Sequence, residues 1–495
     1  MEALKQLISI LNKKRLSKIE ILDRSFLSEK ESLFTKFYEG IVNGSFTSDD
    51  DASMFLYQSD SKDLRYRKLK SRFKKRLINT LYFIDLNEYQ PDTQSRIFFE
   101  LSHIRGAINV LMKLGNSFLP NKLITDNFDK ALKLGDLEVL KEFSFKLLVD
   151  HAVNMEAKDF FAELERFEKF QKASIKEYRA KILYYKSVII FQKKYSNENI
   201  LFLKEELEHL QASLDDDDSF QTFYSLNKAF LFYYENEVDV EKLRYYCDAN
   251  EQLFLRFSTQ VKSMQIGTNS LYKIKLLIAQ RQFNEAYTLC ANVEHLFQPK
   301  GNYNWMVIKE FSFLAALQNE DIPTATGILE EVAAQLKFKH STSPIQEKWK
   351  IYEGYLVFLD EYLNKKPFKF NFAKLDNEVP TYSQDKSGFN FALRVLEILY
   401  QLAKRNFDDI IQRGDALRVY KNRYLHKNKQ TLRSHAFIKL LIKMEKYDFD
   451  FAQLAKYESE DLTILKSTTN RFNSGEWEVI PYDRLWEIII DILKK

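Results

Sequence analysis

Two Glu-x-x-His pairs have the residue types and the spacing that redox metal chemistry needs. Glu100 lies three residues before His103, and Glu206 lies three residues before His209. Residues three apart share one face of a helix, and two such pairs with two further glutamates bind the metals of di-iron carboxylate proteins. The second pair lies in the sequence KEELEH, however, which is typical of a helix face in water. We therefore attribute both pairs to chance, and we predict no metal site and no cofactor.

The two cysteines, Cys247 and Cys290, offer little further chemistry. They are too few for a disulfide framework, and their spacing is not that of metal ligands. We expect Cys290 on the inner face of a helix, where no neighbour would lower the pKa of its thiol. The sequence also lacks the GxxxxGKS/T, GxGxxG, HExxH, GxSxG and CxxC motifs of common enzyme classes. We predict a protein that is not an enzyme and has no catalytic residues.

Residues 62–76 concentrate positive charge, although the net charge of the whole chain is only +4. An apolar stripe with bases on both sides is expected on the helix here, made of Tyr66, Leu69, Phe73, Leu77 and Ile84. Such a helix either packs its stripe inward with its bases in water, or meets an acidic protein, a nucleic acid or an anionic membrane. The bases of this first basic patch are Lys62, Arg65, Arg67, Lys68, Lys70, Arg72, Lys74, Lys75 and Arg76.

A second basic patch lies at residues 413–433, far from the first in sequence. A site that joined the two patches would require the chain of helices to curve. The bases of the second patch are Arg413, Arg418, Lys421, Arg423, Lys427, Lys429 and Arg433. Four consecutive aspartates, residues 215–218, lie between two expected helices. We interpret them as a solvated loop, or as a cap for the helix that starts near Phe220.

The elements that must position these residues are helices. The 495 residues include only 12 Gly and 8 Pro, whereas sandwiches, barrels and doubly wound sheets need many tight turns. Apolar residues recur at intervals of three and four, as at Ile182, Tyr185 and Ile189, and strict alternation is nearly absent. The sequence therefore predicts an all-α fold. Turn signals divide it at Gly135-Asp136, Ser196-Asn197, Glu237-Val238, Arg281-Gln282, Asn319-Glu320, residues 364–367 and Arg405-Asn406.

Most of these breaks are spaced by about 40 residues, which is the interval of a repeated helix-turn-helix unit. The longer interval between the first two breaks predicts an extra helix at residues 157–170. In LYKIKLLIAQRQFNEAYTLCANV, Phe283 and Ala286 resemble the aromatic and small residues that open the second helix of a tetratricopeptide repeat. Ile322 and Ala325, and later Phe407 and Ile410, occupy the corresponding positions.

This resemblance implies an α-solenoid of tetratricopeptide-like repeats. The stretch LDNEVPTYSQDKSG also resembles uncharacterised bacterial proteins of this length, which implies no activity. The last helix, expected after Pro481 and capped by Asp483, is predicted to seal the final repeat. We divide the chain into an N-terminal helical region with the basic helix (1–120), tetratricopeptide-like repeats (121–366), an irregular connector (367–388), and C-terminal repeats with a capping helix (389–495).

A helical-repeat protein of this kind is expected to be a scaffold or adaptor that binds a partner protein or peptide in a concave groove. Aromatic residues near 224–234 are candidate anchors for that partner. The alternative is binding of nucleic acid or ribonucleoprotein through the two basic patches. The sequence shows no secretory signal and no membrane-spanning run, so we expect a cytoplasmic protein with no membrane insertion and no small-molecule substrate.

Overall fold

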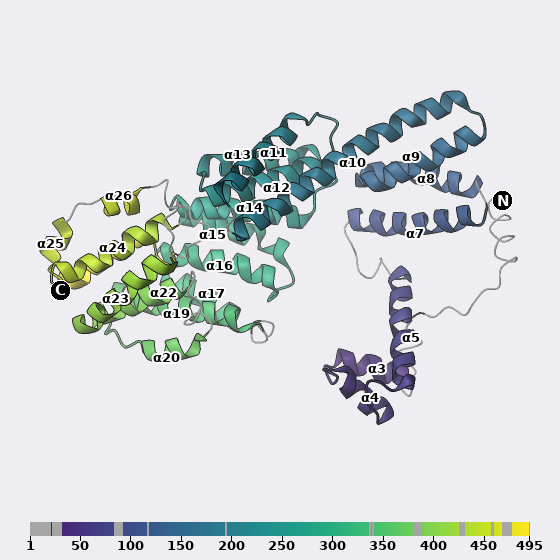
Figure 1. Ribbon diagram of the computed structural model, residues 1–495. Helices are drawn as coiled ribbons and strands as arrows, with labels where there is room; N and C mark the ends of the chain where they lie inside the picture. Colours follow the sequence, from purple (N-terminus) through teal and green to yellow (C-terminus); the bar gives the residue numbers. More distant parts are fainter. Residues whose placement is uncertain are drawn as a thin grey trace. The chain divides into compact units, whose positions relative to one another are not determined.

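The computed structural model describes residues 21, 32–83, 93–115, 118–193, 196–335, 338, 341–380, 389–424, 431–456, 460–467 and 478–494 (Figure 1). Every regular element in these ranges is a helix, which confirms the all-α prediction. None of the helices described there is both long and apolar enough to cross a membrane. The chain forms two compact units, Met1–Gln171 and Lys172–Lys495, and the division falls inside helix α10 (Ala157–Gln192).

The first unit begins with three short helices that share a core of their own. Each helix starts at a residue, Ser32, Ser48 or Asp63, whose side chain accepts a hydrogen bond from a backbone amide of the first turn. The first three residues of the predicted apolar stripe are buried here against Phe37 and Ala52. We call residues 32–83 the N-terminal module. Its helices are α3 (Leu33–Val42), α4 (Asp49–Tyr57), α5 (Leu64–Thr80) and η1 (Leu81–Phe83).

The rest of the first unit consists of longer helices, each packed on the next. They are α7 (Thr93–Lys113), α8 (Phe118–Leu134), α9 (Leu137–Val153) and the first part of α10. The Phe145 and Phe167 rings join α9 to α10, with 5.4 Å between their centroids. The helix predicted at 157–170 is therefore present, but it continues without a break to Gln192. The domain boundary expected after residue 120 lies within α8.

The second unit continues as a series of helices in which sequence neighbours pack together. All seven predicted breaks fall between helices. The connector at 367–388 contains the short helix α20, and residues 381–388 lie outside the described ranges. The helices are α11 (Asn197–Ala212), α12 (Phe220–Glu237), α13 (Val240–Arg256), α14 (Ser263–Ala279), α15 (Phe283–Val293), η2 (Glu294–Phe297), α16 (Tyr303–Gln318), α17 (Ile322–Ala333), α19 (Ser343–Leu363), α20 (Phe372–Glu378), α22 (Phe389–Ala403), α23 (Phe407–Tyr424), α24 (Leu432–Lys446), α25 (Phe451–Lys456), α26 (Glu460–Lys466) and α27 (Tyr482–Lys494).

One backbone geometry recurs at the turns between paired helices. Val238, Arg281, Glu320 and Arg405 have φ of 57°, 61°, 60° and 58°, which is the left-handed conformation. In each turn the next amide donates to the carbonyl five residues earlier, as from Gln282 N to Leu277 O at 2.9 Å. This Schellman arrangement satisfies carbonyls at the helix end and reverses the chain within two residues. The repeated turn explains how a chain with few glycines folds into many closely spaced hairpins.

Small side chains allow the hairpins to pack closely. Ala286 and Ala325, which match small positions of the tetratricopeptide pattern, are both fully buried. Ile410, which matches the same position later in the chain, is also buried. These three residues lie in one continuous hydrophobic core that extends from α14 to α27. Close packing of successive hairpins is therefore a property of the second unit.

The left-handed turns predict a stabilising substitution. Arg405→Gly should raise the free energy of unfolding by about 0.5–1 kcal/mol, because glycine adopts positive φ without the steric cost of a side chain. Arg405 is exposed. Lys404→Gly is the matched control, since its φ is not positive, and it should lower stability by about 0.5–1 kcal/mol. Calorimetry of both variants checks the prediction, and equal shifts in the same direction would contradict it.

Candidate interaction surfaces

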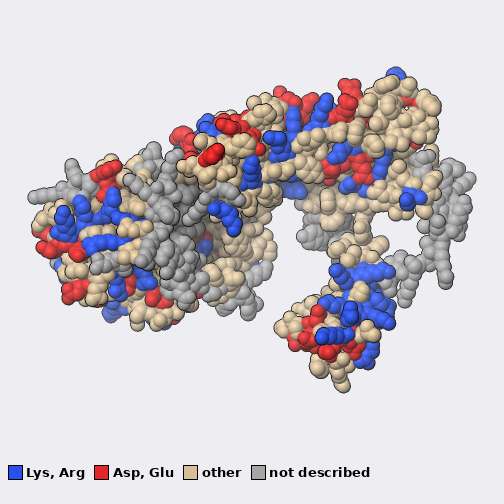
Figure 2. All heavy atoms as spheres, viewed as in Figure 1, with Lys and Arg blue, Asp and Glu red and all other residues tan. Residues whose placement is uncertain are grey.

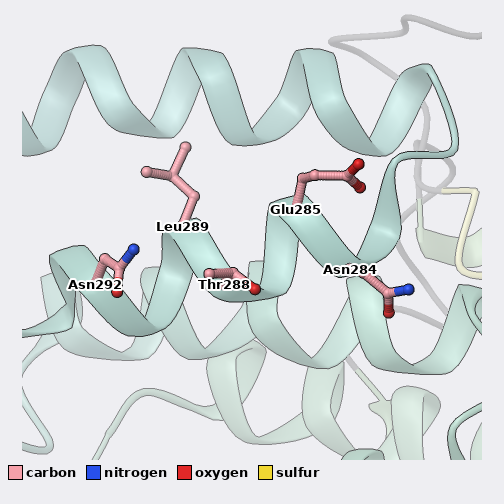
Figure 3. Close-up of a pocket in the computed structure, with 5 residues that line it drawn as sticks. All are labelled: Asn284, Glu285, Thr288, Leu289 and Asn292. Atoms are coloured by element: carbon pink, nitrogen blue, oxygen red, sulfur yellow. The ribbon is translucent and has the colours of Figure 1, made fainter.

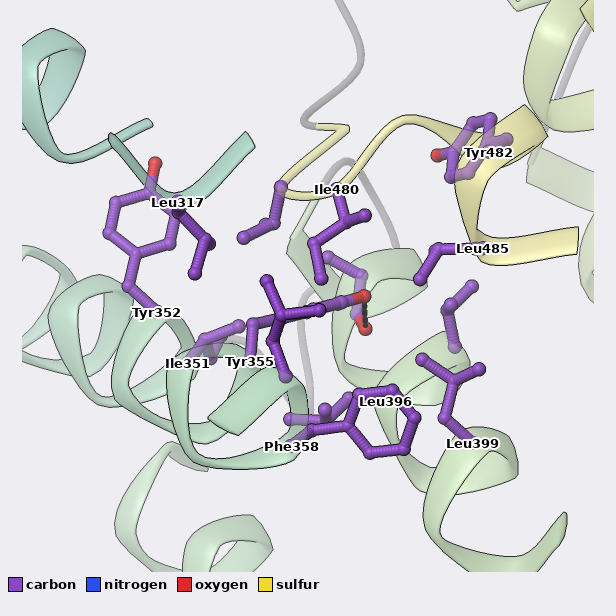
Figure 4. Packing of buried hydrophobic residues seen from close by; sticks show 14 of the residues in the cluster. Leu317, Ile351, Tyr352, Tyr355, Phe358, Leu396, Leu399, Ile480, Tyr482 and Leu485 are labelled. Atoms are coloured by element: carbon purple, nitrogen blue, oxygen red, sulfur yellow. Dashed lines mark hydrogen bonds between the residues drawn. The ribbon is translucent and has the colours of Figure 1, made fainter. Parts of the chain in front are cut away.

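The C-terminal residues 478–494 lie across helices that precede them by up to 200 residues. Figure 4 shows Ile480, Tyr482 and Leu485 in the same hydrophobic cluster as Leu317 and Leu396, and all five are buried. The Gln318 amide donates to two successive backbone carbonyls, those of Glu478 at 3.0 Å and Val479 at 3.3 Å. The protein thus holds its own C-terminal segment against α16, α19 and α22.

Buried and partly buried ion pairs fasten this C-terminal segment. Arg433 on α24 is 1% exposed, and its guanidinium donates to Glu478 at 2.9 Å and to Asp483 at 3.4 Å. Arg281 also pairs with Asp483, and Arg484 pairs with Glu320 at 2.7 Å. The two carboxylates raise the pKa of Arg433 further above its ordinary value, although burial alone would lower it.

Two predictions about this segment need correction. Asp483 does not cap α27, because it lies inside the first turn and its carboxylate pairs with arginines. The last helix does pack on α24, α25 and α26, but it also reaches α22 and the turns after α14 and α16. Its contacts therefore extend beyond the last helices of the second unit.

The aromatic residues proposed as partner anchors are mostly core residues. Tyr224, Phe230, Tyr233 and Tyr234 on α12 are all buried. Phe230 and Tyr246 stack with 4.5 Å between their ring centroids, joining α12 to α13. The aromatic residues of α12 have the type and spacing typical of a helix that packs against neighbours on two of its faces. These side chains do not form a binding surface.

Part of the first basic patch lies on the exposed side of α5, opposite the core of the N-terminal module (Figure 2). Arg72 and Arg76 instead lie over the Phe34 ring of α3, and Lys62 is exposed just before α5 begins. Arg67, Lys68, Lys74 and Lys75 share this side, at positions i, i+1, i+7 and i+8, and all four are exposed. Two pairs of cations therefore stand about 10 Å apart along the helix, since seven residues rise that far. This side of α5 is a coherent positive surface.

Acidic residues that bind some of these bases lie on α4 and at the start of α5. Asp49 accepts hydrogen bonds from Lys70 and Tyr66, both at 2.7 Å, and these lower the pKa of its carboxyl. Asp63 caps α5 and binds Arg65, which holds the pKa of Asp63 well below its usual range. Arg65 and Lys70 are thereby neutralised within the module.

The described residues of the second basic patch do not form one exposed positive surface. Arg433 is buried, as described above. Arg413 pairs with Glu397 at 2.5 Å, and Arg418 pairs with Glu445 at 2.6 Å. Lys421 is partly buried. The side chain of Arg423 and residues Lys427 and Lys429 lie outside the described part of the structure. Sequence spacing could not reveal these pairings, because the acids come from other helices.

An apolar stripe on α10 is exposed, which the sequence analysis did not anticipate. Alternate spacings of three and four place these side chains on one face, and their exposed fractions lie between 50% and 67%. A second apolar set on the same helix, including Ala180, Leu183 and Ile190, is buried in the core with α11 and α12. The helix thus has two apolar faces, and only one is covered. The exposed residues, which we call the α10 stripe, are Ile175, Tyr178, Ile182, Tyr185 and Ile189.

The residues with metal or redox potential have other roles in the structure. Glu100 pairs with Lys130, and Glu206 pairs with Lys186. Burial raises the pKa of the Cys290 thiol to about 11, which makes it a poor nucleophile and agrees with the expected core position. These contacts and burial account for Glu100, Glu206 and Cys290.

Two further groups of residues differ from the sequence analysis or were missed by it. Asp218 in the acidic run is buried and binds Lys176 at 2.8 Å, whereas Ser219 caps α12, so the run is neither simply solvated nor the cap. His151, Glu156 and Asp159 meet near the turn between α9 and α10, in largely exposed positions. An exposed group of this kind is common without a metal.

A hollow of about 460 Å³ on α15 is lined by a single helix. Figure 3 shows Asn284, Glu285, Thr288, Leu289 and Asn292 along it. Asn284 accepts a hydrogen bond from Asn319 at 3.2 Å, so part of its polar capacity is used within the protein. No group of reactive side chains converges there among the residues described.

No protein-family model, curated protein or solved structure matches this chain. The function of the protein must therefore be inferred from the surfaces described above.

The buried arginine predicts a large stability difference between two similar substitutions. Arg433→Met should cost about 3 kcal/mol or more, because it removes the buried cation that Glu478 (partly buried) and Asp483 (buried) share. Arg484→Met breaks a pair whose side chains are about one-third exposed, and it should cost under about 1 kcal/mol. Chemical denaturation of the full chain measures both. Equal losses would contradict the structural role assigned to Arg433.

Proposed function

We propose that this protein is a non-catalytic helical-repeat scaffold that binds a partner protein. The repeated two-residue turns and the packing of most helices on the next one support a tetratricopeptide-like solenoid of about 40-residue units. Such stacking holds a binding surface rigid, so little affinity is lost in ordering it. The two free, buried cysteines fit a reducing compartment, and we propose a cytoplasmic location.

The contact between Gln318 and the C-terminal segment is the main observation behind this proposal. One side-chain amide binds two successive backbone carbonyls, while Val479 and Ile480 are buried beside it. A helical-repeat protein would hold a foreign segment by the same contacts. Because the chain's own segment already covers α16, α19 and α22, we place the partner elsewhere, on the α10 stripe.

Purification of the tagged full-length protein from its native cell tests this function. A protein partner should remain bound after nuclease treatment and in moderate salt, because apolar contacts depend little on ionic strength. Tyr185→Ser should release the partner, and Tyr303→Ser should retain it, since Tyr303 is similarly exposed but lies on α16. A preparation without any stoichiometric protein partner would contradict the proposal.

A second function, nucleic-acid binding, is favoured by one observation on the N-terminal module. Arg67, Lys68, Lys74 and Lys75 form the positive side of α5, whereas Tyr66, Leu69 and Phe73 are buried. A helix that inserts into a membrane surface needs its apolar face free. Since this face is occupied by the module's core, a polyanion fits α5 better than a bilayer does.

Fluorescent RNA and duplex DNA oligonucleotides test this second function. If α5 contacts about four phosphates, log Kd should change with log salt with a slope near 3–4. Lys68→Glu with Lys75→Glu should reduce this slope by about 2. Lys242→Glu with Lys262→Glu, exposed positions elsewhere, make the same change in net charge and should leave the slope nearly unchanged. An identical salt slope for the two double variants would show that α5 is not the nucleic-acid binding site.

A further inference from the structure

The α10 stripe has the spacing of a coiled-coil seam. Its five side chains occupy successive a and d positions of a seven-residue repeat, from Ile175 to Ile189. Monomeric proteins rarely expose large continuous apolar patches, and a narrow stripe at a and d is the form that packs against one other helix. The stripe is about 21 Å long, since fourteen residues separate its ends. It matches a partner helix of about four turns.

Cations follow one edge of the stripe at intervals of seven residues. They are Lys172, Arg179, Lys186 and Lys193, and three of them are exposed. Lys186 is partly buried, pairs with Glu206, and lies 5.0 Å from the centre of the Phe202 ring. Phe202 on α11 is 56% exposed and widens the apolar surface at this edge. These cations occupy the e positions that select the charge of a coiled-coil partner.

The other edge of the stripe is less charged. Ser174, Lys181 and Val188 occupy the g positions, and Lys181 pairs with Glu177 at 2.6 Å. If two copies of α10 paired in antiparallel orientation, the e-position cations of one copy would therefore lie next to those of the other. In a parallel pair, Lys181 of one copy would lie next to Lys186 of the other. Like charges across such a seam are destabilising. The pattern disfavours self-association through this face.

We infer that the α10 stripe binds an acidic amphipathic helix of a partner protein. This inference rests on the proposed scaffold function and specifies its partner. Apolar residues of the partner helix, spaced three and four apart, would pack on Ile175, Ile182 and Ile189. Its Glu or Asp side chains would face Lys172, Arg179 and Lys193. The apolar stripe provides the affinity, and the row of cations selects an acidic partner helix over a basic one.

A pair of synthetic helical peptides tests the inference on the full-length protein. Both have 22 residues with Leu at a and d, one with Glu and the other with Lys at e and g. In fluorescence anisotropy the Glu peptide should bind at least about tenfold more tightly than the Lys peptide. Reversal of three cations, Lys172→Glu, Arg179→Glu and Lys193→Glu, should invert this preference. Lys186 is left intact because it pairs with Glu206.

Substitutions that remove apolar side chains distinguish the α10 stripe from other exposed apolar surfaces. Ile182→Ser with Tyr185→Ser should weaken binding of the Glu peptide at least about tenfold. Leu255→Ser with Tyr303→Ser, which are also exposed apolar residues, should not change it. Circular dichroism of each variant confirms that the fold is retained.

Three results would overturn the inference. They are equal affinity for the two peptides, no binding of either peptide, and a wild-type dimer that Ile182→Ser dissociates in sedimentation equilibrium. If the peptides fail to bind while a nuclease-resistant protein partner is still recovered from cells, the α10 site is wrong and the scaffold function stands. If no protein partner is recovered, the scaffold function itself fails.

Discussion

The ion pairs of buried Arg433 with Glu478 and Asp483 hold the C-terminal segment against the second unit. Arg433 is almost inaccessible to water, so its charge requires these two carboxylates, which flank the start of α27. Their position fixes the C-terminal segment against the second unit. As a result, parts of α16, α19 and α22 are covered by the C-terminal segment and belong to the core of the second unit.

The left-handed turns and the C-terminal segment depend on each other. Arg281 and Glu320 are both left-handed turn residues, and they bind the adjacent residues Asp483 and Arg484. The turn geometry therefore does more than reverse the chain, since it also presents two opposite charges to α27. A sequence with glycine at these turns would relieve backbone strain but lose both contacts. This explains why charged residues occupy positions where glycine is usually favoured.

The sequence predicted the helices and their breaks well because both depend on local signals. Polar and turn-forming residues at Gly135-Asp136 or Arg281-Gln282 mark a break without knowledge of the rest of the fold. The buried stripe of α5 followed from its spacing in the same way. Arg433 was assigned wrongly to a surface patch, because Glu478 and Asp483 lie 45 and 50 residues further on. Ile182, Tyr185 and Ile189 were recognised as an apolar stripe, but periodicity does not show that α10 buries a different face.

Site-specific photocrosslinking in the native cell tests the central claim most directly. A benzophenone amino acid replaces Tyr185 on the α10 stripe or, in the control, Tyr303 on α16; both positions are exposed. The account predicts a crosslink from position 185 to a partner segment whose sequence has apolar residues at intervals of three and four, flanked by Glu or Asp. Crosslinks from position 303 alone, or a segment at 185 that is basic or lacks that periodicity, would contradict it.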